Sequence, residues 1–389
     1  MFLQIHFLTS YHASLLNRDD AGLAKRITFG GTPRIRVSSQ SQKRHWREWL
    51  QENTDVSSAW RTRNFFGRVL VDRVKEHGVE AEIAHDLVHT LATRVLHASG
   101  GNSAIDPDSL TMKQPVLFGE PEARYFTSII IEAARFGDRA AAELSARIER
   151  EKTNFSAMMR QNGLHDPAAG FEGALFGRFV TSDVLARVDA PVHVAHAFTT
   201  HALETEVDYF TVVDDLARND ETGAAHANDM ELGSGIFYGY VVVDIPLLIS
   251  NLTGCTRSQW QKQDWAGSAD LLNLLLHAVA EVSPGAKLGS TAPYARAQCV
   301  VLEVGRAQPR SLANAFLKPI RLGSTGADPI AQSIDAMAKH LTGIERMYGS
   351  DQDGRWVSCM DPWPRAQEET VSFQDAINGA LEAIGGNAL

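Results

Sequence analysis

The sequence predicts an α+β protein built around an antiparallel sheet of the ferredoxin-like type. Segments near residues 2, 192, 236 and 298 have the composition of strands, and segments near residues 40 and 270 have helical periodicity. This order of strands and helices favours an antiparallel α+β sandwich over a doubly wound parallel sheet. With 389 residues, 44% of them hydrophobic, the chain can bury a large core and one or two further lobes.

The first strands are expected on either side of a turn. Residues 2–9 are rich in Phe, Ile and Leu and predict a strand buried on at least one face. After the turn at residues 30–31, residues 34–37 alternate basic and β-branched side chains. Because strand side chains alternate between faces, Arg34 and Arg36 are expected together on a face that meets a ligand.

A helix is expected directly after that strand. It begins near Ser39 or Ser41, because serine is a good N-cap and the residues that follow are good helix formers. Lys43 and Arg47 are four residues apart and share one face of this helix. The side chains expected to point to the interior are those of Trp46, Trp49 and Leu50.

The middle of the chain divides into a helical lobe and a polar stretch between two strands. Residues 56–183 have helical periodicity and predict an inserted helical lobe, and residues 191–201 and 234–244 predict strands. Residues 202–233 are acidic and loop-like, and a connection of this length is usually functional or disordered.

The C-terminal third resumes the alternation of helix and strand. Residues 270–282 predict an amphipathic helix that Pro284 and Gly285 end, and residues 297–304 predict a short apolar strand. The remainder alternates helix and loop.

The distribution of charge gives the clearest indication of function. The chain is acidic, with 37 Lys and Arg against 47 Asp and Glu and a net charge of -10. One segment nevertheless holds seven cations and no acid, and we call these residues the basic strip: Lys25, Arg26, Arg34, Arg36, Lys43, Arg44 and Arg47. A single cationic segment on an acidic chain predicts one groove for a polyanion. The alternative is an ordinary solvated run of charge.

Several classes of site find no support in the sequence. Motifs for nucleotide hydrolysis, hydride transfer, zinc proteolysis and serine hydrolysis are absent. The three cysteines are widely spaced and indicate neither a zinc site nor a disulfide framework. His193, His196 and His201 would not all share one strand face, so we expect no metal and no cofactor. No secretory leader or membrane span is recognised, so we expect a cytoplasmic protein without membrane contact.

Two pairs of carboxylates leave a nuclease open as an alternative. Asp19 and Asp20 follow Arg18, which favours a local turn or ion pair over a metal site. Asp214 and Asp215 lie in the acidic stretch, where phosphate would be repelled unless a metal were bound.

Several blocks of sequence resemble the CasC family, the large backbone subunit of the type I-E CRISPR surveillance complex called Cascade. The blocks occur in the family's order and cover most of the chain. They are Asn17–Asp20, Phe29–Gly31, Arg34–Arg44, Gly177–Phe179, Ala195–His201, Asp208–Leu216, Ser234–Tyr238, Pro284–Lys287 and Asn314–Phe316.

The resemblance implies a right-hand-like shape with an RRM-like palm, helical fingers and an extended thumb that is a hairpin or loop. The corresponding divisions are residues 1–55 for the first part of the palm, 56–183 for the fingers, 184–201 for a palm strand, 202–233 for the thumb, and 234–389 for the second part of the palm and the C-terminal helices.

The resemblance also implies which residues contact RNA. Lys25, Lys43, Arg47 and Lys287 would bind phosphates, and Arg18 would bind phosphate or form a structural pair. Ser38 and Gln40 would bond to sugar or phosphate, or else cap the helix. Tyr209 and Phe210 would form a wedge that displaces a base of the RNA. Relatives often have Trp at the position of Tyr209 and Met at the position of Phe179. Phe179 and Thr211 are the other two residues that the resemblance implies in contact with RNA.

The expected function is therefore a non-catalytic scaffold that oligomerises along CRISPR guide RNA and presents its bases for pairing with target DNA. Its expected partners are the guide RNA, target DNA through the guide, further copies of itself, other Cascade subunits and, at the level of the complex, a recruited nuclease-helicase. The alternatives are a metal-dependent RNase, as in the related backbone of type III complexes, and a generic single-stranded RNA binder.

Overall fold

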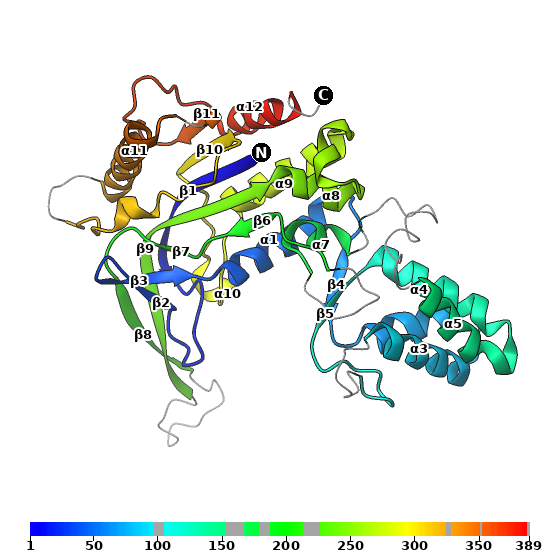
Figure 1. Ribbon diagram of the computed structural model, residues 1–389. Coiled ribbons are helices and arrows are strands. Elements are labelled where there is room, and N and C mark those ends of the chain that lie inside the picture. Colours follow the sequence, from blue (N-terminus) through cyan, green and yellow to red (C-terminus); the bar gives the residue numbers. More distant parts are fainter. Residues whose placement is uncertain are drawn as a thin grey trace, which may run out of the picture. The chain divides into compact units, whose positions relative to one another are not determined.

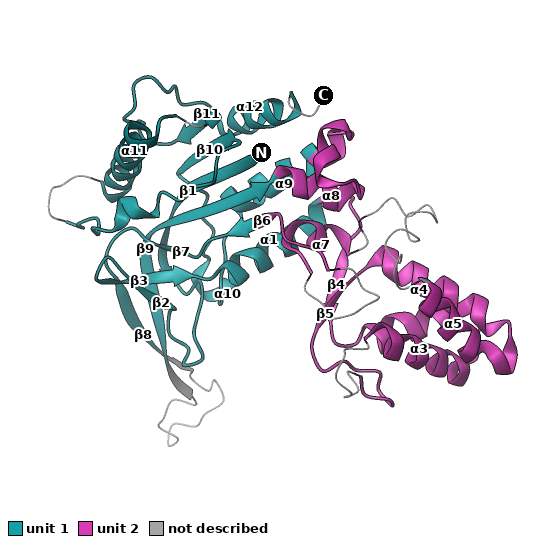
Figure 2. Cartoon of the chain, in the orientation of Figure 1, with its two compact units in different colours: residues 1–53, 193–244, 269–389 teal, residues 54–192, 245–268 magenta. Residues whose placement is uncertain are grey.

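The computed structural model of the chain describes residues 1–96, 105–151, 167, 169–178, 187–212, 226–323, 328–350 and 352–386. The chain forms two compact units, which Figure 2 distinguishes by colour. Unit 1 comprises residues 1–53, 193–244 and 269–389, and unit 2 comprises residues 54–192 and 245–268. The sequence analysis had placed residues 245–268 in the second part of the palm, whereas here they belong to the same unit as the helical lobe.

Unit 1 is built on a sheet in the order β11-β10-β1-β9-β7-β3-β2, and neighbouring strands along this order are antiparallel (Figure 1). Two further strands, β6 and β8, pair with β9. The strands are β1 (Phe2–Ser14), β2 (Arg26–Phe29), β3 (Thr32–Val37), β6 (Val192–Val194), β7 (Ala197–Thr199), β8 (Thr205–Val212), β9 (His226–Asp244), β10 (Cys299–Gly305) and β11 (Gln352–Cys359).

The connections within this sheet follow the ferredoxin-like pattern. Helix α1 (Ser39–Asn53) follows the first strands, and the chain returns to the sheet at β6 and β7 after residues 54–192 of unit 2. Helix α9 (Ala266–Glu281) lies between β9 and β10 in the chain. The central order β10-β1-β9-β7, read with these two helices, is a split βαβ arrangement. The predicted antiparallel α+β class is therefore confirmed.

Strand β1 lies at the centre of the sheet and is covered on both faces. Phe7 packs against the opposite residue of β9, Gly239, where a Cβ would lie 2.0 Å from Phe7 Cζ. Leu8 points to the other face and joins a core with helix α11 (Pro329–Tyr348) and the short helix η4 (Ala313–Phe316). Burial on both faces explains why residues 2–9 are rich in Phe, Ile and Leu and why the polar Gln4 and His6 among them are also buried.

A network of buried ion pairs lies on the α11 side of the sheet. Glu303 on β10 is fully buried and accepts two hydrogen bonds from Arg310, at 2.6 and 3.0 Å, and one from Arg355 at 2.7 Å. His6 donates from Nε2 to the same carboxylate at 3.3 Å and accepts from the Tyr238 hydroxyl at 2.9 Å. The sequence analysis did not foresee this network.

Helix α12 (Phe373–Gly385) packs against β10 and β11 at the β11 end of the sheet. Cys299 and Cys359 face each other across β10 and β11 and form a disulfide. The expectation of unpaired cysteines is therefore wrong for these two residues. Their separation by 60 residues hid the pairing, because only the strand register brings them opposite each other.

Strands β8 and β9 form an extended ribbon, with Thr205 opposite Gly233 and Val212 opposite His226 (Figure 1). The sequence analysis treated residues 202–233 as loop-like, and this is wrong for residues 205–212 and 226–233. The high content of Asp and Glu suggested a loop, because acidic residues are depleted in strands. Residues 213–225 lie outside the described part of the chain.

Unit 2 is mainly helical and has its own apolar core, centred on Phe65, Phe66, Phe118 and Phe126. A short ribbon of β4 (Ala59–Thr62) and β5 (Val116–Gly119) joins its helices. The helices are η1 (Phe65–Leu70), α2 (Val71–Glu76), α3 (Ala81–Val95), α4 (Glu120–Ala134), η2 (Gly137–Arg139), α5 (Ala140–Glu151), α7 (Gly170–Phe176), α8 (Ile245–Thr253) and η3 (Arg257–Lys262).

None of the helices in the described part of the chain has the length and hydropathy that a membrane span requires.

Candidate nucleic-acid interface

The structure divides the basic strip into a buried and an accessible part. Arg34 is fully buried, and its guanidinium donates to the backbone oxygens of Thr199 at 2.8 Å, His201 at 3.2 Å and Phe316 at 2.9 Å. The expectation that Arg34 faces a ligand is therefore wrong. Helix η4 covers that face of β3, so Arg34 serves to join three segments of unit 1.

Arg36, in contrast, belongs to an accessible cationic cluster. Its guanidinium donates to His196 Nδ1 at 3.0 Å and to the backbone oxygen of Arg26 at 3.1 Å. Its backbone N–H donates to the backbone oxygen of Lys25 at 2.8 Å. Burial and the positive charges of Arg36 and Lys25 lower the pKa of His196, so the imidazole is neutral at pH 7 and accepts the arginine's hydrogen bond.

The sequence analysis considered His196 only as a metal ligand and gave it no role in binding RNA. The pairing of β3 with β7, which sets Arg36 opposite Phe198, brings the histidine to the cluster. Arg36, unlike Arg34, therefore keeps the accessible position expected for it, and we add His196 to the candidate interface beside Arg36 and Lys25.

The N-terminus of α1 lies next to this cluster. Ser38 is buried, and its Oγ accepts the backbone N–H of Ser41 at 3.3 Å, which is the capping role foreseen for it. Asn17 Oδ1 accepts the N–H of Ser38 at 3.0 Å, and the backbone oxygen of Asn17 accepts the N–H of Lys25 at 2.9 Å. Asn17 thus holds the segment of Lys25 against the start of α1.

Gln40 and Arg18 are both exposed beside this start. Arg18 forms an isolated bridge with Ala24, and its side chain has no acidic partner among the described residues. Asp19 Oδ1 instead accepts the backbone N–H groups of Ala21 and Leu23 at 3.0 and 2.9 Å. Asp19 therefore holds a local turn, as expected, and Arg18 remains available to a ligand.

Helix α1 has two flanks beside its buried face, one with Lys43 and Arg47 and the other with His45. Lys43 and Arg47 are half-buried and share one flank, while Trp46 and Leu50 are buried. His45 is two residues, or about 200°, from Lys43 and therefore points to the opposite side.

His45 connects α1 to the loop that carries Lys287. Its Nδ1 donates to the backbone oxygen of Ser41 at 2.8 Å, which leaves Nε2 to accept the N–H of Gly285 at 3.4 Å. The N–H of Ala286 donates to the backbone oxygen of Leu15 at 2.9 Å. Half-buried Lys287 thus belongs to the His45 flank and is not brought together with Lys43 and Arg47.

The aromatic residues of the predicted wedge are placed only in part. Tyr209 lies on β8 opposite Asp229, and 65% of it is exposed. Phe210 and Thr211 follow on the same strand, opposite Asn228 and Ala227. Phe179, Asp214 and Asp215 lie outside the described residues.

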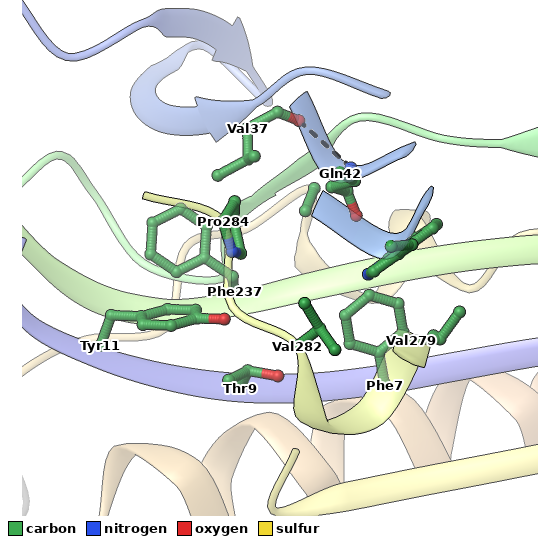
Figure 3. A pocket seen from close by; sticks show the side chains of 11 residues that line it. Phe7, Thr9, Tyr11, Val37, Gln42, Phe237, Val279, Val282 and Pro284 are labelled. Carbon is green, nitrogen blue, oxygen red and sulfur yellow. Dashed lines mark hydrogen bonds between the residues drawn. The ribbon is translucent and has the colours of Figure 1, made fainter. Parts of the chain in front are cut away.

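The small cavity between α1 and the sheet is not a ligand site (Figure 3). It measures about 20 Å³, which is room for one water molecule, and Phe7, Tyr11 and Phe237 are among the side chains that line it. Burial raises the pKa of Tyr11 to about 12, so its hydroxyl stays protonated.

A larger cleft in unit 2, of about 380 Å³, is lined by Arg61, Arg178 and Arg187. Two of these charges are already compensated. Arg178 forms a buried pair with Glu122 at 2.7 Å, and Arg187 bonds to Asp189 at 3.1 Å. The cleft therefore offers less positive charge than its arginines suggest.

The described residues contain no group of three or more His, Cys, Asp or Glu side chains that could hold a metal ion. His201, considered above as a ligand, is buried and satisfied within the fold. Its Nδ1 donates to the backbone oxygen of Ala202 at 2.7 Å, and its Nε2 accepts the N–H of Ile236 at 3.2 Å.

Comparison with known proteins gives one family and a set of similar folds. The model of a family described as CT1975-like protein matches residues 3–383. A chain of a "CRISPR RNA-guided surveillance complex, pre-nicking" is 24% identical with a TM-score of 0.77, over 98% of this chain and 100% of that chain. A chain of a "CRISPR RNA-guided surveillance complex" is 21% identical with a TM-score of 0.69, over the same shares. No curated protein matches the chain.

Proposed function

The chain belongs to the family of CT1975-like proteins, and we propose that it is a guide-RNA-binding backbone subunit of a CRISPR surveillance complex. The observation that carries this proposal is the cluster of Lys25, Arg36 and His196 beside the start of α1. It places the positive charges of Lys25 and Arg36 on one accessible surface of a chain whose net charge is -10, and the neutral His196 accepts a hydrogen bond from Arg36. The folds of the solved surveillance-complex chains support the same function.

The geometry suits binding to a sugar-phosphate backbone. Lys25, Arg36, Lys43 and Arg47 would contact phosphates, Arg18 and Gln40 would add contacts at the start of α1, and Lys287 would contact the strand on the other flank. Contacts to phosphates fix the register of a strand without reading its bases. Any guide sequence is then accepted, and base pairing alone selects the target.

We further propose that the complex is of the type I-E Cascade class and that several copies line one guide. In that arrangement the β8–β9 ribbon is the thumb, and Tyr209, Phe210 and Thr211 lie against RNA. A head-to-tail contact between identical copies does not close on itself and therefore produces a helical filament. The remaining partners are other Cascade subunits, target DNA paired to the guide, and a recruited nuclease-helicase.

We propose no catalytic role for the chain. The carboxylate of Asp19, one of the candidates for a metal-dependent RNase, already accepts two backbone N–H groups. Cleavage of the target would then be the task of the recruited nuclease, and the complex would act in the cytoplasm.

Co-purification of RNA tests the proposal. The full chain is expressed with a CRISPR array and the other subunits of the complex, and the bound RNA is sized and sequenced. We expect RNA of one repeat-derived length. Heterogeneous cellular RNA would instead identify a generic single-strand binder, and Mg²⁺-dependent cleavage of complementary RNA at regular intervals would identify an RNase.

A further inference from the structure

The loop after α9 exposes an aromatic residue that the sequence analysis did not select. Tyr294 is 75% exposed, more than Tyr209 on the ribbon, and it follows the buried Pro293. A single exposed aromatic needs no explanation by itself. The surroundings of Tyr294, however, are unusual for a passive surface residue.

The backbone that carries Tyr294 is strained and braced. Ala292 has φ of +39°, a conformation that residues other than glycine seldom adopt. The N–H of Tyr294 donates to the backbone oxygen of Ala292 at 2.7 Å. Ser283 Oγ then closes the loop, since it donates to the backbone oxygen of Ala295 at 3.0 Å and accepts the N–H of Ala295 at 2.9 Å. Ala292 is the C-cap of the short helix α10 (Leu288–Thr291), and its left-handed conformation sets the direction in which the chain leaves that helix.

The same loop is fixed to the candidate interface. The N–H of Gly285 donates a hydrogen bond to His45 of α1, and Gly285 lies close to residues from the start and the end of the loop. A Cβ at this position would lie 2.6 Å from Leu288 Cδ2 and 2.9 Å from Pro293 Cγ. Leu288 and Pro293, the neighbours of Lys287 and Tyr294 in sequence, therefore both lie close to Gly285, on the His45 flank of α1.

A cation and an exposed aromatic ring on one loop are groups that a single-stranded nucleic acid can recognise. Phosphates pair with the cation, and unstacked bases stack on the ring without regard to sequence. Arg296, two residues further on, is also exposed and lies 3.4 Å from Glu281. A loop held in one conformation binds at a lower entropic cost than a mobile one.

We propose that Tyr294 is a stacking platform for an unpaired base of the bound RNA, next to a phosphate contacted by Lys287. This inference rests on the proposed function, because it requires a single-stranded RNA on this flank of α1. It adds a base contact that tolerates any sequence to a surface otherwise made of phosphate contacts.

The test compares Tyr294→Ala with Tyr348→Ala in the full chain, using a short unstructured RNA. Tyr348, at the end of α11, is 73% exposed and provides a matched control. We expect Tyr294→Ala to weaken binding roughly 5- to 100-fold, while Tyr294→Phe and Tyr348→Ala stay within about twofold of the unchanged chain. Circular dichroism checks that each variant is folded, and Tyr294→Leu provides a second variant that keeps an apolar side chain without a ring.

Two further measurements identify stacking. The loss caused by Tyr294→Ala should disappear on an abasic RNA of the same length, because no base remains to stack. The slope of log K against log salt should be unchanged in Tyr294→Ala but lower by about 0.7 in Lys287→Ala, which removes a phosphate contact. Equal affinities of Tyr294→Ala and Tyr348→Ala, with the unchanged chain binding RNA, would overturn the inference alone. Absence of RNA binding by the unchanged chain would overturn both the inference and the proposed function.

Discussion

At the scale of single residues, Arg34 and Arg36 show that similar positions can have opposite roles. Both are arginines on β3, two residues apart, and strand alternation correctly puts them on one face. Arg34 is nevertheless fully buried under Phe316, while Arg36 reaches His196 at the surface. The segment that covers Arg34 comes about 280 residues later in the chain, so no local pattern could have revealed it.

This difference predicts that Arg34→Met and Arg36→Met have separate effects. Arg34→Met removes three hydrogen bonds to buried backbone oxygens and should lower the free energy of unfolding by roughly 2–4 kcal/mol. Arg36→Met should change stability by less than about 1 kcal/mol and weaken RNA binding. Urea unfolding and RNA titration of both variants provide the measurement. Equal stability of the two variants would show that Arg34 does not hold these segments together.

At the scale of elements, the sequence predicted those with a strong local pattern. Strand β1, helix α1 and helix α9 were foreseen, because apolar periodicity and the serine cap determine them locally. Strand β8 was missed, because acidic residues such as its Glu206 and Asp208 are typical of loops. Within the described residues, β8 pairs with β9 alone. Charged side chains on an edge strand also discourage unwanted pairing.

The candidate interface was predicted only as far as it is continuous in sequence. Lys25, Lys43 and Arg47 follow from the composition of the basic strip, whereas His196 reaches it through strand register. Lys43 and Lys287 lie on two different flanks of α1, because a hydrogen bond from Gly285 to His45 holds the Lys287 loop on the far side of the helix. Contacts of this kind join residues about 240 positions apart and cannot be derived from periodicity.

At the scale of the whole molecule, the buried network around Glu303 makes stability depend on pH. Hydrogen bonds from His6 and Arg310 hold the pKa of Glu303 far below its usual range, and Arg365 and Arg355 lower that of Glu345. Burial lowers the pKa of His6, so its imidazole is neutral in the fold. All three groups bind protons more readily in the unfolded chain, and stability therefore rises with pH.

We therefore expect the free energy of unfolding to be greatest near pH 7 and to fall in two steps as the pH is lowered. The contribution of His6 is lost as the pH falls below about 6.5, and those of Glu303 and Glu345 are lost below about 4.5. Glu303→Gln should lower the free energy of unfolding at pH 7 by roughly 3–5 kcal/mol. Below about pH 4.5 the free energy of unfolding of this variant should depend less on pH than that of the unchanged chain. Glu48→Gln, in an exposed pair with Arg44, is the control and should have little effect. Unchanged acid sensitivity in Glu303→Gln would contradict this role of the network.

The central claim is that cationic side chains on and around helix α1 of unit 1 hold the RNA backbone, and lysine footprinting tests it most directly. The RNA-bound complex and the RNA-free chain are acetylated under the same conditions, and mass spectrometry compares each lysine. We predict strong protection of Lys25, Lys43 and Lys287, with exposed Lys75 and Lys339 modified equally in both states. Full reactivity of Lys25 and Lys43 in the RNA-bound complex would contradict the claim.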